Sequence, residues 1–355
     1  MRSELFELHE QAGARMVEVD GWEAPDVFTS VEAEYAAAHG GAVVYDSSPL
    51  GQLRLTGRTR VDFLHRLSTN DMNALEPGQG RATILTTPIA RIVDRVVVYV
   101  REDDLIVLTS RGARTAVARW LTKHIFFNDD VRIHEAPAEF GMISIYGAKA
   151  GEVAARIAGQ DVAGLGLHAW RAVRGEALIA RADPIAGDGF HVLVPAPAGL
   201  ASWWQAAVTA GAAPIGEQAL EVLRIESGRP RYARELSEAY IPLEVGLWPD
   251  VSFSKGCYIG QEVIARMESR HRLAKQLVGL RSDMPIESDA EIAVGGAAVG
   301  RVSSAALRPT GDSIALGFVR PAQAAAGTRV SIGADRSIDA EITGFPIRVV
   351  SARTA

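Results

Sequence analysis

Short apolar runs alternate with amphipathic segments over residues 1–275. Runs rich in Val, Ile and Leu that are bounded by Gly, Pro and Asp predict strands, whereas apolar residues recurring every three or four positions predict helices. The predicted strands are 42–47, 51–57, several within 81–110, 140–147 and 191–195. The predicted helices are 31–40, 58–71, 114–125, 148–159 and 199–212. Neighbouring strands mixed with helices in this way predict an α+β fold.

The pattern changes at Gln276, after which short β runs are separated by Gly, Asp and Pro turns with little helical signal. Such a series predicts a separate small all-β domain, either a barrel or a sandwich, over residues 276–355.

Composition narrows the possible classes of protein. The 355 residues carry 37 Lys and Arg against 43 Asp and Glu, so the net charge is −6, which gives no sign of a nucleic-acid binder. The single cysteine excludes an internal disulfide and a zinc site built on several thiolates. No apolar stretch reaches the ~18 residues of a membrane span, and the N-terminus lacks a signal-peptide core. We therefore expect a cytoplasmic protein without a metal site, since the histidines are scattered along the chain.

Reactive side chains concentrate between residues 220 and 270, and Cys257 is the most conspicuous of them. Lys255, the neighbouring glycines and a predicted helix start at Gln261 all favour the thiolate form. This interpretation makes Cys257 a reactive or ligand-donating thiol. The alternative is a small buried apolar residue, which is the usual role of a free cysteine.

Glu226 ends the apolar segment LEVLRI. A carboxylate in that position can accept two N–H donors from a ring such as a pterin. The alternative is an ion pair with Arg224 at the surface, which would contribute little stability.

Several segments together resemble one known family. KGCYIGQEVIAR (255–266) is similar to the K-G-C-[FY]-x-G-Q-E signature of the YgfZ-type folate-binding proteins, which belong to the aminomethyltransferase (glycine-cleavage T-protein) superfamily. DFLHRLSTNDMNALEPGQG (62–80) and LRIESGRPRY (223–232) resemble two further motifs of that superfamily. The opening segment, the GDGFHVLVP segment and the tail extend the resemblance over nearly the whole chain.

The resemblance implies a three-lobed α+β arrangement around a central tetrahydrofolate cavity, closed by a C-terminal β-barrel. The folate-binding region would span 1–275, with one lobe formed by about 1–50 and 140–275 and the other by 51–139, and the barrel would span 276–355. It also implies a folate ligand and, as partners, iron–sulfur proteins or their assembly machinery, without direct contact to nucleic acid or membrane.

Individual residues carry over by their position in the motifs. Glu226 matches the glutamate that holds the pterin ring, and Tyr232 matches the tyrosine that follows it, although a core aromatic is an alternative. Asn70 and Asp71 match a loop near the folate, although Asn-Asp is also ordinary turn chemistry. Arg266, at the end of the signature, completes the expected folate site. In the same signature Cys257 would be a redox group or transient ligand, with Lys255 beside it.

Two departures separate the chain from the transferases of the superfamily. Their G-G-x-x-D-D-L run, which holds a catalytic aspartate, becomes IARIVDRVV (89–97), so the acid pair becomes Asp94-Arg95. Arginine cannot act as a base at neutral pH. The polar positions of a second loop fall on Pro184 and Gly187.

Three hypotheses follow. The leading one is a tetrahydrofolate-binding accessory protein that supports assembly or repair of iron–sulfur proteins and is not a transferase. The alternative is a tetrahydrofolate-dependent aminomethyl- or methyltransferase in which Asp94 acts on the folate nitrogen. The third is an interaction scaffold that has lost folate binding.

Overall fold

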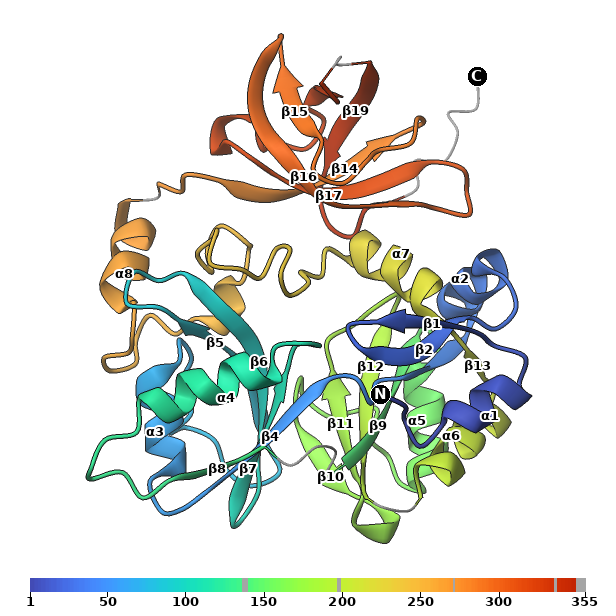
Figure 1. Cartoon of the computed structure of the whole chain (residues 1–355), viewed down its shortest axis with the longest axis vertical. Coiled ribbons are helices and arrows are strands. Elements are labelled where there is room, and N and C mark those ends of the chain that lie inside the picture. Colours follow the sequence, from blue (N-terminus) through green and yellow to red (C-terminus); the bar gives the residue numbers. More distant parts are fainter. Residues whose placement is uncertain (136–139, 197–198, 271, 335–336, 349–355) are drawn as a thin grey trace.

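Three lobes surround a common centre in the computed structural model, which describes residues 1–135, 140–196, 199–270, 272–334 and 337–348 (Figure 1). One lobe is built on a five-stranded sheet, one on a six-stranded sheet, and the third is a closed barrel. Figure 1 places the barrel at the top and the two sheet lobes side by side below it. The predicted α+β architecture with a C-terminal β-barrel is therefore confirmed.

The five-stranded lobe is a continuous antiparallel sheet in the order β5-β6-β7-β4-β8, with two helices. Its elements are β4 (Gly51–Thr56), α3 (Arg60–Leu67), β5 (Gly80–Thr86), β6 (Ile92–Val100), β7 (Asp104–Thr109), α4 (Arg114–Lys123) and β8 (Arg132–His134). Successive side chains of a strand point to opposite faces of the sheet, so Asp94 and Arg95 of β6 face opposite ways. Asp94 faces inward and is fully buried, whereas Arg95 reaches the neighbouring lobe.

The six-stranded lobe joins segments that are far apart in the sequence, in the order β10-β11-β12-β9-β3-β13. Its elements are α1 (Phe6–Gln11), α2 (Val31–Gly40), β3 (Ala42–Asp46), β9 (Phe140–Gly147), α5 (Ala150–Ala158), β10 (Trp170–Ala172), η1 (Arg174–Glu176), β11 (Leu178–Ala182), β12 (Asp188–Pro195), α6 (Leu200–Thr209), β13 (Ala212–Pro214) and α7 (Glu217–Ser227). All five residues of β3 are buried because helices pack against this strand. The chain thus enters the lobe early, leaves it for the five-stranded sheet, and returns at β9.

A small hairpin precedes these lobes and was not predicted. It pairs β1 (Arg15–Val19) with β2 (Trp22–Val27). Asp20 and Gly21 form its two-residue turn, with φ of 53° and 78°. Asp-Gly is well suited to this turn because both positions require positive φ. The half-exposed strands lack the continuous apolar run by which the other strands were predicted.

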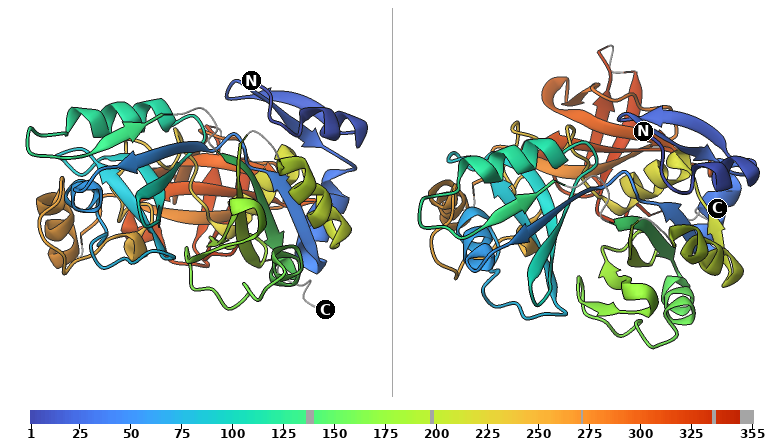
Figure 2. Two further views of the ribbon diagram at one scale, coloured as in Figure 1. Left: turned by 90° about the horizontal axis from the view of Figure 1, so that it is seen from below. Right: turned by 60° about the horizontal axis from the view of Figure 1, so that its bottom comes forward.

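The barrel closes in the order β14-β17-β16-β15-β18-β19. Its elements are β14 (Gln276–Ser282), β15 (Glu291–Val294), β16 (Ala297–Leu307), β17 (Ser313–Val319), η3 (Pro321–Gln323), β18 (Arg329–Ile332) and β19 (Ile338–Thr343). A long connection containing η2 (Trp248–Asp250) and α8 (Gln261–Arg270) leads to it from α7. Both views in Figure 2 keep α8 beside the five-stranded lobe.

Most of the predicted elements are present, with some corrections. The helix predicted over 58–71 covers only Arg60–Leu67, because the backbone is extended from Ser68. The apolar residues of LEVLRI lie in α7, so Glu226 occupies the last turn of a helix. Arg224 pairs with Glu221 and Glu235, which replaces the surface pair with Glu226 that we considered. Within the described residues, no helix is long and apolar enough to cross a bilayer.

Glu235, on the connection after α7, links the barrel to the rest of the molecule. Its fully buried carboxylate accepts hydrogen bonds from the hydroxyls of Ser303 (2.5 Å) and Ser304 (2.7 Å), both on β16. It also accepts the backbone N–H of Arg231 at 2.9 Å. Glu235 therefore ties the connection to the barrel wall.

We predict that Glu235→Ala lowers the free energy of unfolding by about 2–4 kcal/mol, because buried donors lose their acceptor. Urea unfolding followed by circular dichroism measures this change. Glu238→Ala, at an exposed position of the same connection, is the matched control and should stay close to the wild-type value. Equal stability of the two variants would contradict the linking role of Glu235.

Candidate functional site

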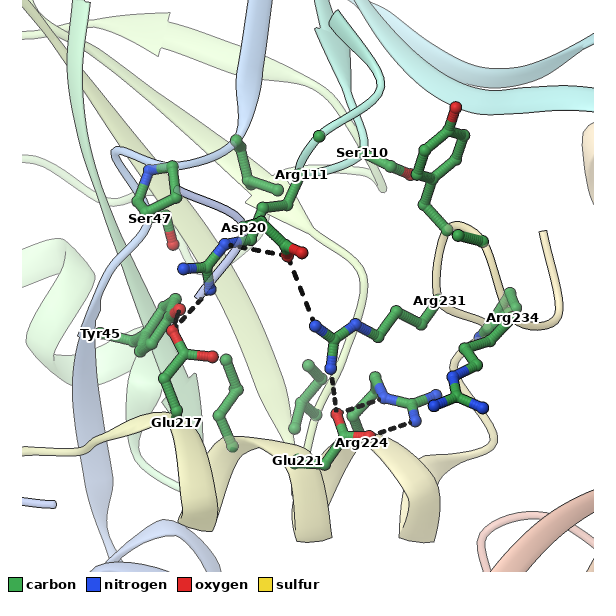
Figure 3. Close-up of a pocket in the computed structure, with 18 of the residues that line it drawn as sticks. Asp20, Tyr45, Ser47, Ser110, Arg111, Glu217, Glu221, Arg224, Arg231 and Arg234 are labelled. Atoms are coloured by element: carbon green, nitrogen blue, oxygen red, sulfur yellow. Dashed lines mark hydrogen bonds and ion pairs between the residues drawn. The ribbon is translucent and has the colours of Figure 1, made fainter. Parts of the chain in front are cut away.

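A cavity of about 630 Å³ lies where the two sheet lobes face the connection after α7 (Figure 3). We call it the tyrosine–arginine cavity after the residues that define it: Tyr45, Tyr146, Tyr232, Arg111, Arg224, Arg231 and Arg234. Three carboxylates also line it, those of Asp20, Glu217 and Glu221. Aromatic faces and a surplus of arginines give a site that suits a flat, anionic ligand.

Helix α7 supplies one polar wall of this cavity. Glu217, Glu221 and Arg224 are spaced by four and three residues, so they share one face of the helix. Glu221 accepts two hydrogen bonds from Arg224, at 2.6 and 2.8 Å. Glu217 accepts the Tyr45 hydroxyl at 2.5 Å and Arg111 at 2.7 Å. Both α7 carboxylates thus have close partners of their own.

A second cavity, of about 790 Å³, lies on the other side of Pro230, which lines both. We call it the apolar cavity because Leu, Val, Pro, Trp and Phe side chains form much of its wall. His39, Glu226 and Arg229 add polar groups to its lining.

A partly buried ion-pair network lies near both cavities. Arg95 donates to Asp250 at 2.6 Å and to Asp183 at 2.8 Å, and Arg229 contacts Asp183 at 2.9 Å. Burial disfavours the charged forms of Arg95 and Asp183. The attraction between Arg95 and its carboxylate partners outweighs burial, so it raises the pKa of Arg95 and holds the pKa of Asp183 well below its usual range. Arg95 and Asp183 therefore stay charged at neutral pH. Burial lowers the pKa of the adjacent His168 to about 4, so this ring is neutral.

Asp94 lies directly behind the wall of the tyrosine–arginine cavity. Its two carboxylate oxygens accept the backbone N–H groups of Arg95 and Ser110, each at 2.9 Å, and Ser110 lines the cavity. Burial raises the pKa of Asp94 to about 6, against the opposing effect of these hydrogen bonds. Burial raises the pKa of Tyr232, and the negative charge of Asp94 raises it further.

Glu226 lines the apolar cavity and is already engaged by protein groups. Its carboxylate accepts the Tyr35 hydroxyl at 2.5 Å and lies 3.2 Å from His39 and 3.5 Å from Arg308 of the barrel. Burial opposes its charge, but the hydrogen bonds from His39 and Tyr35 lower its pKa overall. Glu226 therefore helps to hold the barrel against α2 and α7.

The remaining predicted residues gather elsewhere, around the start of α8. The Lys255 ammonium donates to the backbone carbonyls of His65, of Ser68 at 2.7 Å and of Asn70 at 3.0 Å. Burial lowers its pKa to about 8. These three acceptors match the three protons of an ammonium group, so Lys255 anchors the Cys257 loop to the loop after α3.

Cys257 itself is exposed, as is Arg266 on α8. The buried amide of Asn70 donates to the carbonyls of Ala82 and Pro249, at 3.0 and 3.3 Å, and Asp71 accepts from Asn73 in a turn. The turn interpretation therefore describes the contact of Asp71, whereas the Asn70 amide joins segments that are distant in the sequence. The role of both residues toward folate stays a prediction.

The structure thus separates the predicted site into three places. Tyr232 lines the tyrosine–arginine cavity with Asp94 buried behind its wall, Glu226 lines the apolar cavity, and Lys255, Cys257 and Asn70 form a third group. Sequence reasoning missed Arg111, which belongs to no recognised motif, and did not single out Arg231 within the 223–232 segment.

Comparisons with known proteins agree with this architecture. Residues 5–255 match the GCVT N-terminal domain, and residues 275–347 match the glycine cleavage T-protein C-terminal barrel domain. The chain is 32% identical over 300 residues to the putative transferase At1g60990, chloroplastic, of Arabidopsis thaliana, covering 84% of this chain and 69% of that protein. It is 32% identical over 352 residues to an aminomethyltransferase of Rubrobacter xylanophilus, covering 97% and 93%. The crystal structure of the glycine cleavage system aminomethyltransferase T from Bartonella henselae has the same fold, with a TM-score of 0.88, 22% identity and 98% of both chains covered.

The raised pKa of Asp94 predicts a pH-dependent stability. Since the folded carboxyl has a pKa of about 6 and an unfolded one about 3.9, the folded state binds its proton more tightly. The Asp94 carboxyl therefore stabilises the folded state most at low pH. Its contribution to the free energy of unfolding is lost as the pH rises through about 6. Between pH 5 and pH 7.5 the loss is about 1.4 kcal/mol.

The measurement is urea unfolding of the wild type and Asp94→Asn at both pH values. The wild-type free energy minus that of the variant should fall by about 1.4 kcal/mol as the pH rises. Asp103→Asn, on an exposed turn, controls for the loss of one negative charge. A difference that stays constant or rises with pH would show that burial does not control this carboxyl.

Proposed function

Because the chain belongs to the glycine-cleavage T-protein (GcvT) family, we propose that it binds tetrahydrofolate in the tyrosine–arginine cavity. The observation that carries this proposal is the combination of three tyrosines and four arginines around one cavity of about 630 Å³. That volume lies within the roughly 300–1,000 Å³ typical of sites for small molecules.

The residues present suit the chemical parts of tetrahydrofolate. Its ring system and aromatic linker need flat apolar walls, which Tyr45, Tyr146 and Tyr232 offer. Its glutamate carboxylates need cationic donors, and among the described residues the buried Nε of Arg111 makes no hydrogen bond, with Asp20 as a looser ion-pair partner at 3.4 Å. When bound, tetrahydrofolate supplies the nitrogen atoms that carry a one-carbon unit.

One-carbon transfer is the activity that the relatives favour for this chain. The two relatives described above are named an aminomethyltransferase and a putative transferase. Asp94 is fully buried and accepts the backbone N–H of Ser110, which lines the cavity. We therefore propose that Asp94 is a positioning residue, which holds Ser110 in place for the reaction. The proposed activity is tetrahydrofolate-dependent aminomethyl or methyl transfer.

A second candidate is the accessory role in assembly or repair of iron–sulfur proteins. The names of the relatives do not support it, but two observations favour it. Cys257 is exposed at the end of a loop that Lys255 anchors, and Arg95 occupies the second position of the acid pair. A single cysteine cannot hold a cluster alone, so in this role the thiol acts together with groups of a partner protein.

Tyr232→Ala should weaken tetrahydrofolate binding by about tenfold or more, because the cavity loses an aromatic wall. Anaerobic calorimetric titration measures the dissociation constant. Glu226→Gln is the matched comparison, because Glu226 lines the apolar cavity and should leave the affinity within about threefold of the wild type. Loss of binding in Glu226→Gln alone would move the folate site to the apolar cavity. A wild type that does not bind would contradict the proposal.

The two roles predict different behaviour of two variants. For a transferase, the wild type consumes tetrahydrofolate in the presence of an aminomethyl donor, and Asp94→Asn lowers the rate by about tenfold or more while Cys257→Ser does not. The unfolding measurements on Asp94→Asn show whether the variant is folded. Folate binding without turnover, together with reduced iron–sulfur enzyme activity in cells carrying Cys257→Ser, would favour the accessory role.

A further inference from the structure

The tip of the β1–β2 hairpin places a carboxylate at the tyrosine–arginine cavity. Asp20 lines this cavity although it belongs to neither sheet lobe, and its carboxylate lies between Arg111 and Arg231 (Figure 3). The distances are 3.4 Å from Arg111 Nε and 3.5 Å from Arg231 Nη2. The Asp20 side chain is 44% exposed, so solvent reaches this contact.

Asp20 is the loosely held member of the three carboxylates that line the cavity. Glu217 and Glu221 each accept charge-assisted hydrogen bonds of 2.8 Å or less. Asp20 instead makes long contacts, at 3.4 Å to Arg111 and 3.5 Å to Arg231. The contact of Arg231 with Glu221 is also long, at 3.7 Å. Long contacts made by an exposed carboxylate such as Asp20 contribute little stability. Asp20 is thus the carboxylate that a ligand displaces most readily.

The hairpin does not depend on Asp20 for its position. Arg111 Nη2 donates to the Val19 carbonyl at 2.7 Å and so anchors the end of β1 independently of the Asp20 side chain. Asn-Gly forms the same tight turn as Asp-Gly, since both residues tolerate positive φ. The charge of Asp20 can therefore be removed while the hairpin stays in place.

We propose that Arg111 and Arg231 form a subsite for a carboxylate of the ligand, and that Asp20 occupies this subsite until the ligand displaces it. The inference rests on the proposed function in that the ligand is taken to be a folate, whose carboxylates lie on its glutamate tail. Arginine pairs recognise carboxylates by charge and by multiple N–H donors. Asp20 then lowers the affinity for a tail-bearing ligand without affecting a ligand that lacks the tail.

The test compares tetrahydrofolate with tetrahydropteroate, which has the same rings but no glutamate. Asp20→Asn should tighten tetrahydrofolate binding by about three- to tenfold and Arg231→Gln should weaken it by about tenfold, and neither should change tetrahydropteroate binding. Glu18→Gln, which removes an exposed charge from the same hairpin, should change neither affinity. Calorimetry on the full chain gives each dissociation constant.

The outcomes separate the subsite from the proposed function. The subsite would be overturned if Asp20→Asn bound tetrahydrofolate with the wild-type affinity, or if the dissociation constants of tetrahydrofolate and tetrahydropteroate changed equally. Either result would leave the proposal of folate binding intact. If neither compound binds, p-aminobenzoyl-glutamate is the next probe. Its binding, strengthened by Asp20→Asn, would support the subsite and contradict the folate proposal, and its failure to bind would overturn both.

Discussion

The largely buried charge of Arg95 constrains how the centre of this molecule is assembled. An arginine cannot lose its proton at neutral pH, so burying it requires carboxylates that stay close and ionised. Asp183 comes from the six-stranded lobe and Asp250 from the connection toward the barrel. Separating these segments would leave a charge without a partner in a region of low polarity. The network therefore fixes how the lobes meet, and with it the shapes of the cavities beside them.

The same network explains how the chain can keep the family fold while changing the chemistry of its centre. The resemblance aligns Arg95 with the second acid of the Asp-Asp pair of the transferases, and Asp183 and Asp250 neutralise the positive charge of Arg95. The other acid, Asp94, turns inward and accepts two backbone N–H groups. Under our proposal, one-carbon transfer requires that the buried Asp94 carboxyl act through Ser110. The presence of the carboxyl alone does not distinguish a transferase from an accessory protein.

Local patterns in the sequence were sufficient for most elements and for the barrel, because periodicity and turn residues act over short distances. They were not sufficient for the site. Motif matching grouped Glu226, Tyr232 and Asn70, yet α7 turns Glu226 toward the barrel, the connection places Tyr232 at the other cavity, and Asn70 holds backbone carbonyls. The arginines of the cavity come from the end of β7, from α7 and from the connection, and only tertiary packing brings them together. The β1–β2 hairpin was not predicted, because its half-exposed strands lack a continuous apolar run.

The anchoring of Lys255 has a mechanical consequence. Its ammonium group fastens the loop that carries Cys257 to the carbonyl groups at the end of α3 and in the loop after it. The thiol is therefore part of the rigid frame of the five-stranded lobe, although in sequence it belongs to the connection toward the barrel. If the five-stranded lobe rotates, the Cys257 sulfur moves with it. The position of this sulfur at the surface therefore changes with the orientation of the lobe.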